Sequence, residues 1–126
     1  IANHQLKSLY VELKKQPCLV AFVADQTPVE TDKAYWTKFL SQNTPFYKGF
    51  GALAQKTDAI VLYASIQKIN RGFYEIKFDT ITKHAAKNTE DEIVEKYVRL
   101  LENDIQQKPE YWLWSHRRWK RAGIKY

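Results

Sequence analysis

A group of side chains able to bind phosphate and lipid lies near the C-terminus, where residues 109–120 read PEYWLWSHRRWK. Basic side chains bind phosphate oxygens through charge-assisted hydrogen bonds, and tryptophan favours membrane–water interfaces. The candidate phosphate ligands are His116, Arg117, Arg118 and Lys120, and the candidate interface residues are Trp112, Trp114 and Trp119. We expect some of the indoles to dock onto the domain while the basic side chains face outward. The alternative role is structural: an aromatic anchor carrying solubilising charges.

The positive charge of the chain is concentrated in the same region. The 126 residues carry a formal net charge of +6, and from Lys108 onward six basic residues stand against one acid, Glu110. The six are Lys108, Arg117, Arg118, Lys120, Arg121 and Lys125. A basic segment of this kind favours an acidic partner, namely anionic lipid, nucleic acid or an acidic protein.

The sequence holds no other pattern that indicates catalysis or metal binding. Its three histidines, His4, His84 and His116, and its one cysteine, Cys18, match no metal-ligand spacing. A phosphate-binding glycine loop and a nucleophile elbow are also missing from it. We therefore expect no metal and no cofactor. We expect His4 at the surface or in a helix cap, His84 in solvent and Cys18 as a buried thiol.

The elements that must position these residues follow from hydrophobic periodicity. Three helices are predicted: one between Asn3 and Pro17, one over 49–56, and one that a Thr89–Glu92 capping box opens and Pro109 ends. Residues 59–69 and 73–80 predict a hairpin. The apolar run 18–24 predicts a strand covered on both faces, and 25–45 a long loop. The order α-β-loop-α-β-β-α indicates one α/β domain over residues 1–126, with a partial mixed sheet flanked by helices.

Asp25 and Gln26 directly follow the predicted strand 18–24. Ligands of open α/β sheets bind outside the carboxyl ends of the strands, so these two residues are candidates for a site. The alternative is that the carboxylate and the amide fasten the loop that follows them. Both roles are compatible with the sequence.

These features resemble the late acyltransferases of lipid A biosynthesis, which belong to the bacterial lysophospholipid acyltransferase superfamily. The specific part is the terminus Pro109-Glu110-x-Trp112-x-Trp114-x-His116-Arg117-Arg118-Trp119-Lys120, because members of the family close with this pattern. The Asp25-Gln26 strand, residues 44–49 (TPFYKG) and the strand at 59–65 also fall in family order. The resemblance covers nearly the whole chain, but only the C-terminal part of a glycerolipid-acyltransferase-like fold.

The resemblance implies an enzyme that transfers a fatty acyl group from acyl carrier protein, or CoA, to a hydroxyl of a lipid A precursor or related glycolipid. It implies work at the cytoplasmic face of the bacterial inner membrane, where the basic surface also attracts the acidic carrier protein. The implied phosphate contacts are Arg117, Arg118, Lys120, His116 and Lys48. Trp112, Trp114 and Trp119 would lie at the interface, and Asp25 and Gln26 would order the loop near the active centre.

The catalytic signature of the family is a histidine followed five positions later by Asp or Glu, which orients the imidazole as a general base. His4, His84 and His116 are followed at that spacing by Leu9, Thr89 and Arg121. The chain also begins with Ile1 and contains no methionine. We therefore expect a C-terminal fragment, inactive alone, whose catalytic pair lies upstream. The sheet edge left open in such a fragment is expected to favour pairing with a second copy.

A second class of function remains compatible with the sequence: a basic module without enzymatic activity that binds anionic lipid or single-stranded nucleic acid. Nucleic-acid binding would use aromatic stacking together with phosphate contacts. The tryptophans, however, cluster at one end of the chain, and no RNA-binding motif is present. The sequence therefore favours lipid over nucleic acid as the partner.

Overall fold

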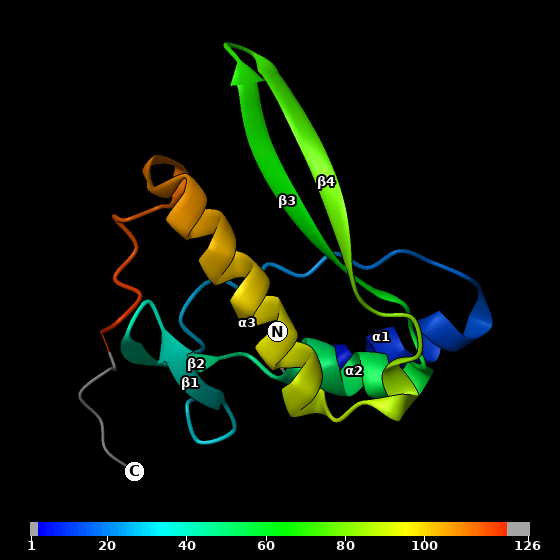
Figure 1. Cartoon of the computed structure of the whole chain (residues 1–126). Coiled ribbons are helices and arrows are strands. Elements are labelled where there is room, and N and C mark those ends of the chain that lie inside the picture. The colour runs from blue at the N-terminus through cyan, green and yellow to red at the C-terminus, as the bar shows by residue number, and fades with distance from the viewer. Residues whose placement is uncertain (1–2, 121–126) are drawn as a thin grey trace.

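The computed structural model describes residues 3–120 and combines helices with two small antiparallel sheets (Figure 1). In chain order, the elements are α1 (Asn3–Lys15), β1 (Tyr35–Phe39), β2 (Gln42–Phe46), α2 (Gly49–Thr57), β3 (Val61–Asn70), β4 (Phe73–Thr82), the short 3-10 helix η1 (Ala85–Lys87), α3 (Glu90–Gln107) and the 3-10 helix η2 (Pro109–Tyr111). The predicted α/β class is confirmed. The side chains of Asn3 and His4, and residues Arg121 and Lys125, lie outside the described part.

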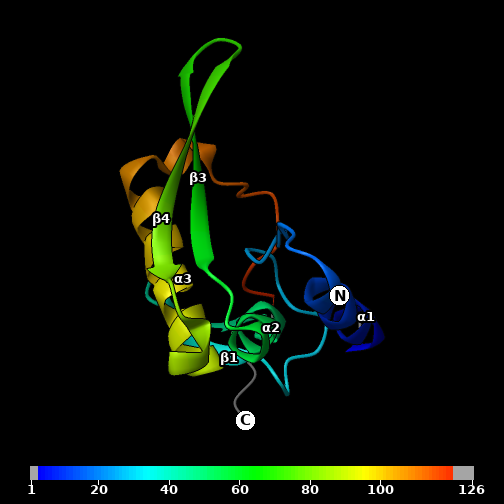
Figure 2. The ribbon, with the colours of Figure 1, turned by 90° about the vertical axis from the view of Figure 1, so that its right-hand side faces the viewer.

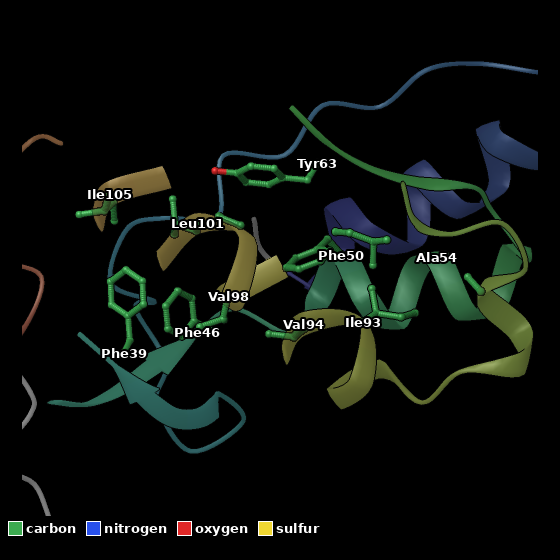
Figure 3. Close-up of a cluster of buried hydrophobic side chains, with 13 residues drawn as sticks. Phe39, Phe46, Phe50, Ala54, Tyr63, Ile93, Val94, Val98, Leu101 and Ile105 are labelled. Atoms are coloured by element: carbon green, nitrogen blue, oxygen red, sulfur yellow. The ribbon is translucent and has the colours of Figure 1, made fainter. Parts of the chain in front are cut away.

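The longest helix, α3, organises the core. Thr89 caps it: the Thr89 hydroxyl accepts a hydrogen bond from the Glu92 amide, and the Glu92 carboxylate accepts one from the Thr89 amide, which confirms the predicted capping box. Its apolar face meets side chains from α2, from β3 and from the β1–β2 hairpin (Figure 3). The buried core residues shown there include Phe39, Phe46, Phe50, Ala54, Tyr63, Ile93, Val94, Val98, Leu101 and Ile105.

The predicted β3–β4 hairpin is also confirmed. Gly72 in its turn has a φ of 83°, a conformation that glycine adopts without steric cost. The two strands pair antiparallel from Val61↔Thr82 to Asn70↔Phe73. In both views the turn end of the ribbon extends beyond the helices (Figures 1 and 2).

The predicted strand at 18–24 is wrong. No strand is assigned anywhere between Lys15 and Tyr35, and within this run Leu19 is 94% and Val23 82% exposed. Cys18 is exposed, so the predicted burial of its thiol is also wrong. An apolar run forms a strand only where a neighbouring strand satisfies its backbone groups, and 18–24 has no such neighbour among the described residues. Only Phe22 and Ala24 of this run reach the core.

The predicted loop at 25–45 is wrong in its second half, which forms the β1–β2 hairpin. Leu40 and Ser41 in its turn take the left-handed conformation, with φ values of 49° and 66°. Such turns usually carry Asn-Gly or Asp-Gly, and this one carries neither, so its sequence gives no hairpin signal. The Glu102 carboxylate of α3 accepts a 2.6 Å hydrogen bond from the Leu40 amide. A tertiary contact therefore supports a turn that local sequence does not favour.

The predicted mixed sheet is not what the structure contains. The described residues form two separate two-stranded antiparallel sheets, β1–β2 and β3–β4. None of the helices within residues 3–120 is long and apolar enough to cross a bilayer.

Candidate functional site at the C-terminal motif

The segment that follows α3 folds back onto the β1–β2 hairpin. The rings of Trp112 and Trp119 both pack against the buried Phe39 ring, with centroids 6.2 and 6.3 Å away. The Trp119 indole N–H donates a 2.9 Å hydrogen bond to the Thr44 hydroxyl. Two of the three candidate interface tryptophans therefore brace the terminus against the core.

Trp114 is the more exposed member of the group, at 54%. Its ring stacks on the Trp119 ring at 6.5 Å, and its indole N–H donates a 2.7 Å hydrogen bond to the Pro109 carbonyl. Leu113 beside it is 62% exposed. The expectation that some of the indoles dock onto the domain is confirmed for Trp112 and Trp119, whereas Trp114 lies on the outside.

Arg118 is not on the surface, which corrects the expectation that all four basic side chains of the motif face outward. The residue is 1% exposed and is the largest fully buried side chain among the described residues. Its Nη2 donates a 2.7 Å hydrogen bond to the Pro45 carbonyl, and its guanidinium lies 4.4 Å from the centre of the Phe46 ring. The buried Nε and Nη1 meet no hydrogen-bond partner among residues 3–120.

The electrostatics of Arg118 follow from this burial. Burial lowers the pKa of the guanidinium to about 10, and the ionised forms of Tyr97 and Asp25 act in the opposite direction. The group therefore stays protonated near neutral pH. A cation held over an aromatic face is attracted by the ring quadrupole, which offsets part of the desolvation cost.

Thr27 connects the Asp25-Gln26 segment to the C-terminal motif. Its hydroxyl donates a 2.8 Å hydrogen bond to the Arg118 carbonyl, and its amide donates a 3.3 Å hydrogen bond to Nε2 of His116. His116 is half-buried, and its Nε2 must carry a lone pair to accept this bond. Two segments about 90 residues apart in the sequence are thus joined side by side.

The structure thereby brings together some of the predicted site residues and separates others. Asp25 is half-buried close to Arg118, whereas Gln26 is exposed. The segment was expected to follow a strand; it instead follows residues without helix or strand, and the Thr27 contacts hold it in place. Arg117 and Lys120 are exposed beside these buried groups.

Lys48 lies in a different environment. Its ammonium forms salt bridges of 2.7 Å with Glu90 and 2.8 Å with Asp91, at the first turn of α3. The hydrogen bonds that the Lys48 ammonium donates to the carboxylates of Asp91 and Glu90 raise its pKa. Its charge is therefore already balanced within the fold, and the structure gives it a role in joining α2 to α3.

Sequence reasoning missed the residues that hold the motif in place. Thr27 donates hydrogen bonds to His116 and to the Arg118 carbonyl. The Pro45 carbonyl accepts one from the Arg118 side chain, and the Thr44 hydroxyl accepts one from Trp119. A threonine directly after Asp25-Gln26 was the available signal for Thr27. The hydrogen bond to the Pro45 carbonyl could not be predicted in this way, because every residue has a backbone carbonyl.

A sequence profile of the bacterial lipid A biosynthesis acyltransferases matches residues 1–121, which includes the whole C-terminal motif at 109–120. The chain belongs to this family. No curated protein matches the chain in a sequence search. Membership assigns the chain to a family of acyl-transferring enzymes of lipid A synthesis.

Within this acyltransferase family member, the motif has two sets of side chains. His116, Arg118 and Trp119 point inward and hold the terminus against the β1–β2 hairpin and the Thr27 segment. Arg117, Lys120 and Trp114 stay exposed. Exposed cations are able to bind phosphate, and an exposed indole is able to lie at a membrane interface.

Proposed function

We propose that this chain is the substrate-binding and membrane-binding part of an enzyme that transfers a fatty acyl group to a hydroxyl of a lipid A precursor or a related glycolipid. The donor is acyl carrier protein, or CoA, and the reaction takes place at the cytoplasmic face of the inner membrane. The observation that carries the proposal is the family match over residues 1–121, which includes the motif that ends in Lys120.

The placement of the motif supports specific roles. Arg117 and Lys120, both exposed, contact phosphates of the acceptor or of anionic lipid. Trp114 sets the depth of this surface at the membrane interface. Arg118 acts through its neighbours: it holds the turn that presents Arg117 and Lys120, and does not itself reach the lipid.

The proton-abstracting group lies outside these 126 residues, because no histidine in them is followed five positions later by an acid. In the complete reaction, a histidine removes the proton of the acceptor hydroxyl, and the resulting oxygen attacks the thioester carbonyl. Expulsion of the thiolate completes the transfer. The exposed cations of this chain also attract the acidic carrier protein by long-range electrostatics.

Vesicle binding tests the role of the exposed cations. Each basic residue near an anionic membrane contributes about 1 kcal/mol, so Arg117→Ala/Lys120→Ala should lower the partition coefficient roughly 30-fold on phosphatidylglycerol vesicles. The matched control is Lys7→Ala/Lys56→Ala, which removes the same charge from α1 and α2, on the side of Figure 1 opposite the tail. An equal loss in both pairs would show that only total charge matters and would contradict the assignment.

The acyl-transfer step is tested on the native gene product with acyl carrier protein thioester and a lipid A precursor. Mass spectrometry should detect one added acyl chain, and Arg117→Ala should raise the acceptor KM more than it lowers kcat. Residues 1–126 alone should give no product. Transfer by residues 1–126 alone would contradict the placement of the base outside them.

A further inference from the structure

Strand β4 of the β3–β4 ribbon is exposed along most of its length. Residues 73–80 of β4 are all exposed, and the turn end of the ribbon extends beyond the helices in both views (Figures 1 and 2). Among the described residues, β4 pairs only with β3. Its other edge therefore presents a row of unpaired N–H and C=O groups, which is a template for pairing with another strand.

The two faces of the ribbon differ in chemistry. The pairs Ala64↔Phe78, Ile66↔Ile76 and Lys68↔Tyr74 share one face, and Ser65↔Lys77 and Gln67↔Glu75 share the other. On the first face, Tyr74 is 65%, Ile76 54% and Phe78 64% exposed. On the second face, Lys77 and Glu75 form a salt bridge of 3.3 Å along the strand.

These residues are arranged symmetrically about Ile76. If β4 pairs antiparallel with β4 of a second copy, and Ile76 lies opposite Ile76 of that copy, then Tyr74 lies opposite Phe78 and Glu75 lies opposite Lys77. By symmetry each contact occurs twice. The apolar face then matches aromatic and aliphatic side chains, and the polar face matches opposite charges, the two kinds of cross-strand pair that stabilise sheets.

We propose that two copies of this chain associate through antiparallel pairing of their β4 strands, centred on Ile76, to form a continuous four-stranded sheet. The interface is isologous, as expected of a two-fold dimer. The inference goes beyond the proposed acyl transfer and uses none of the residues of the C-terminal motif.

A second copy fits this edge better than a bilayer does. Open sheet edges do not enter hydrocarbon, because each unsatisfied backbone group costs several kcal/mol there. Strand pairing satisfies those groups. The charges of Glu75 and Lys77 would also gain nothing from contact with hydrocarbon. In an antiparallel pair of β4 strands, each of them lies opposite a residue of opposite charge.

Charge exchange tests the register. Sedimentation equilibrium of residues 1–126 should show a monomer–dimer equilibrium. Glu75→Lys and Lys77→Glu, each alone, place like charges opposite each other twice and should raise the dimer Kd at least tenfold. The combined exchange Glu75→Lys/Lys77→Glu should restore the Kd to within about threefold of the original. Lys87→Glu in η1 is the control and should leave it unchanged.

Disulfide trapping gives a second readout that does not depend on dimer strength. In a Cys18→Ser background, Ile76→Cys should form an intermolecular disulfide under mild oxidation. Thr80→Cys should not, because the two copies of position 80 would lie eight residues apart along the paired strands, roughly 27 Å. A monomer at all concentrations, a combined exchange that fails to restore the dimer, or equal trapping at positions 76 and 80 would overturn the proposal. Each outcome is independent of whether the chain takes part in acyl transfer.

Discussion

At the scale of single residues, the main finding concerns two adjacent arginines with different environments. Arg118 is buried against Phe46 and bonded to the Pro45 carbonyl, whereas Arg117 is exposed. In the sequence they are indistinguishable members of one basic cluster. The contrast separates the residue that positions the motif from the one that is free to bind a ligand.

Arg118→Ala should lower the free energy of unfolding by about 2–4 kcal/mol, because it leaves the Pro45 carbonyl unpaired and opens a cavity beside Phe46. Arg117→Ala is the matched control and should change it by no more than about 0.5 kcal/mol. Urea denaturation followed by tryptophan fluorescence measures both. Equal effects of the two substitutions would mean that Arg118 is not held as the structure describes.

At the scale of elements, helix α3 depends on its first turn. Thr89 and Glu92 exchange hydrogen bonds with each other's backbone amides, and three acids, Glu90, Asp91 and Glu92, lie where the helix dipole favours negative charge. Lys48 is bonded to two of these acids and so attaches α2 to the same turn. The turn therefore joins the two helices that carry much of the core.

Thr89→Ala should destabilise the fold by about 1 kcal/mol, since loss of an N-cap hydroxyl costs 0.5–2 kcal/mol. Ser115→Ala removes an exposed hydroxyl in the tail and serves as the control, with an expected change near zero. Thermal unfolding followed by circular dichroism at the helix band measures the difference. An unchanged midpoint for Thr89→Ala would show that the cap contributes nothing to folding.

At the scale of the whole molecule, buried phenols make the free energy of unfolding fall at alkaline pH. Burial raises the pKa of Tyr97, and burial together with the 2.8 Å hydrogen bond to Asp104 raises the pKa of Tyr63. An unfolded tyrosine ionises near pH 10. The folded state therefore holds more protons above that pH, and stability is fully present below pH 10 and is lost as the pH rises further.

At pH 11, each of these two phenols should lower the free energy of unfolding by about 1.4 kcal/mol. Guanidinium denaturation at pH 8 and pH 11 measures the decrease in the free energy of unfolding between the two pH values. Tyr63→Phe/Tyr97→Phe should make this decrease smaller. The control pair Tyr74→Phe/Tyr111→Phe replaces exposed tyrosines and should leave the fall as it is. If both pairs of substitutions changed the decrease in unfolding free energy equally, burial of the phenols would not be the cause of the decrease.

The sequence by itself determined the local elements and the family. Helical spacing, the Thr89–Glu92 box, Gly72 in the turn and Pro109 after α3 each act within a few residues, so their consequences can be derived from the chain alone. The terminal motif was likewise specific enough to indicate the acyltransferases, and the profile match confirms it. These local signals do not depend on contacts across the core.

Only the tertiary structure decided which side chains are buried and which apolar runs become strands. The pattern of residues 18–24 predicts a strand, yet these residues form none, because no other strand within 3–120 pairs with them. The turn at Leu40–Ser41 forms because Glu102, about 60 residues away, accepts its amide hydrogen bond. Arg118 is buried because Phe46 and Pro45 lie beneath it. Strand pairing, turn support and burial are all properties of contacts between distant segments, and a pattern of neighbouring residues does not contain them.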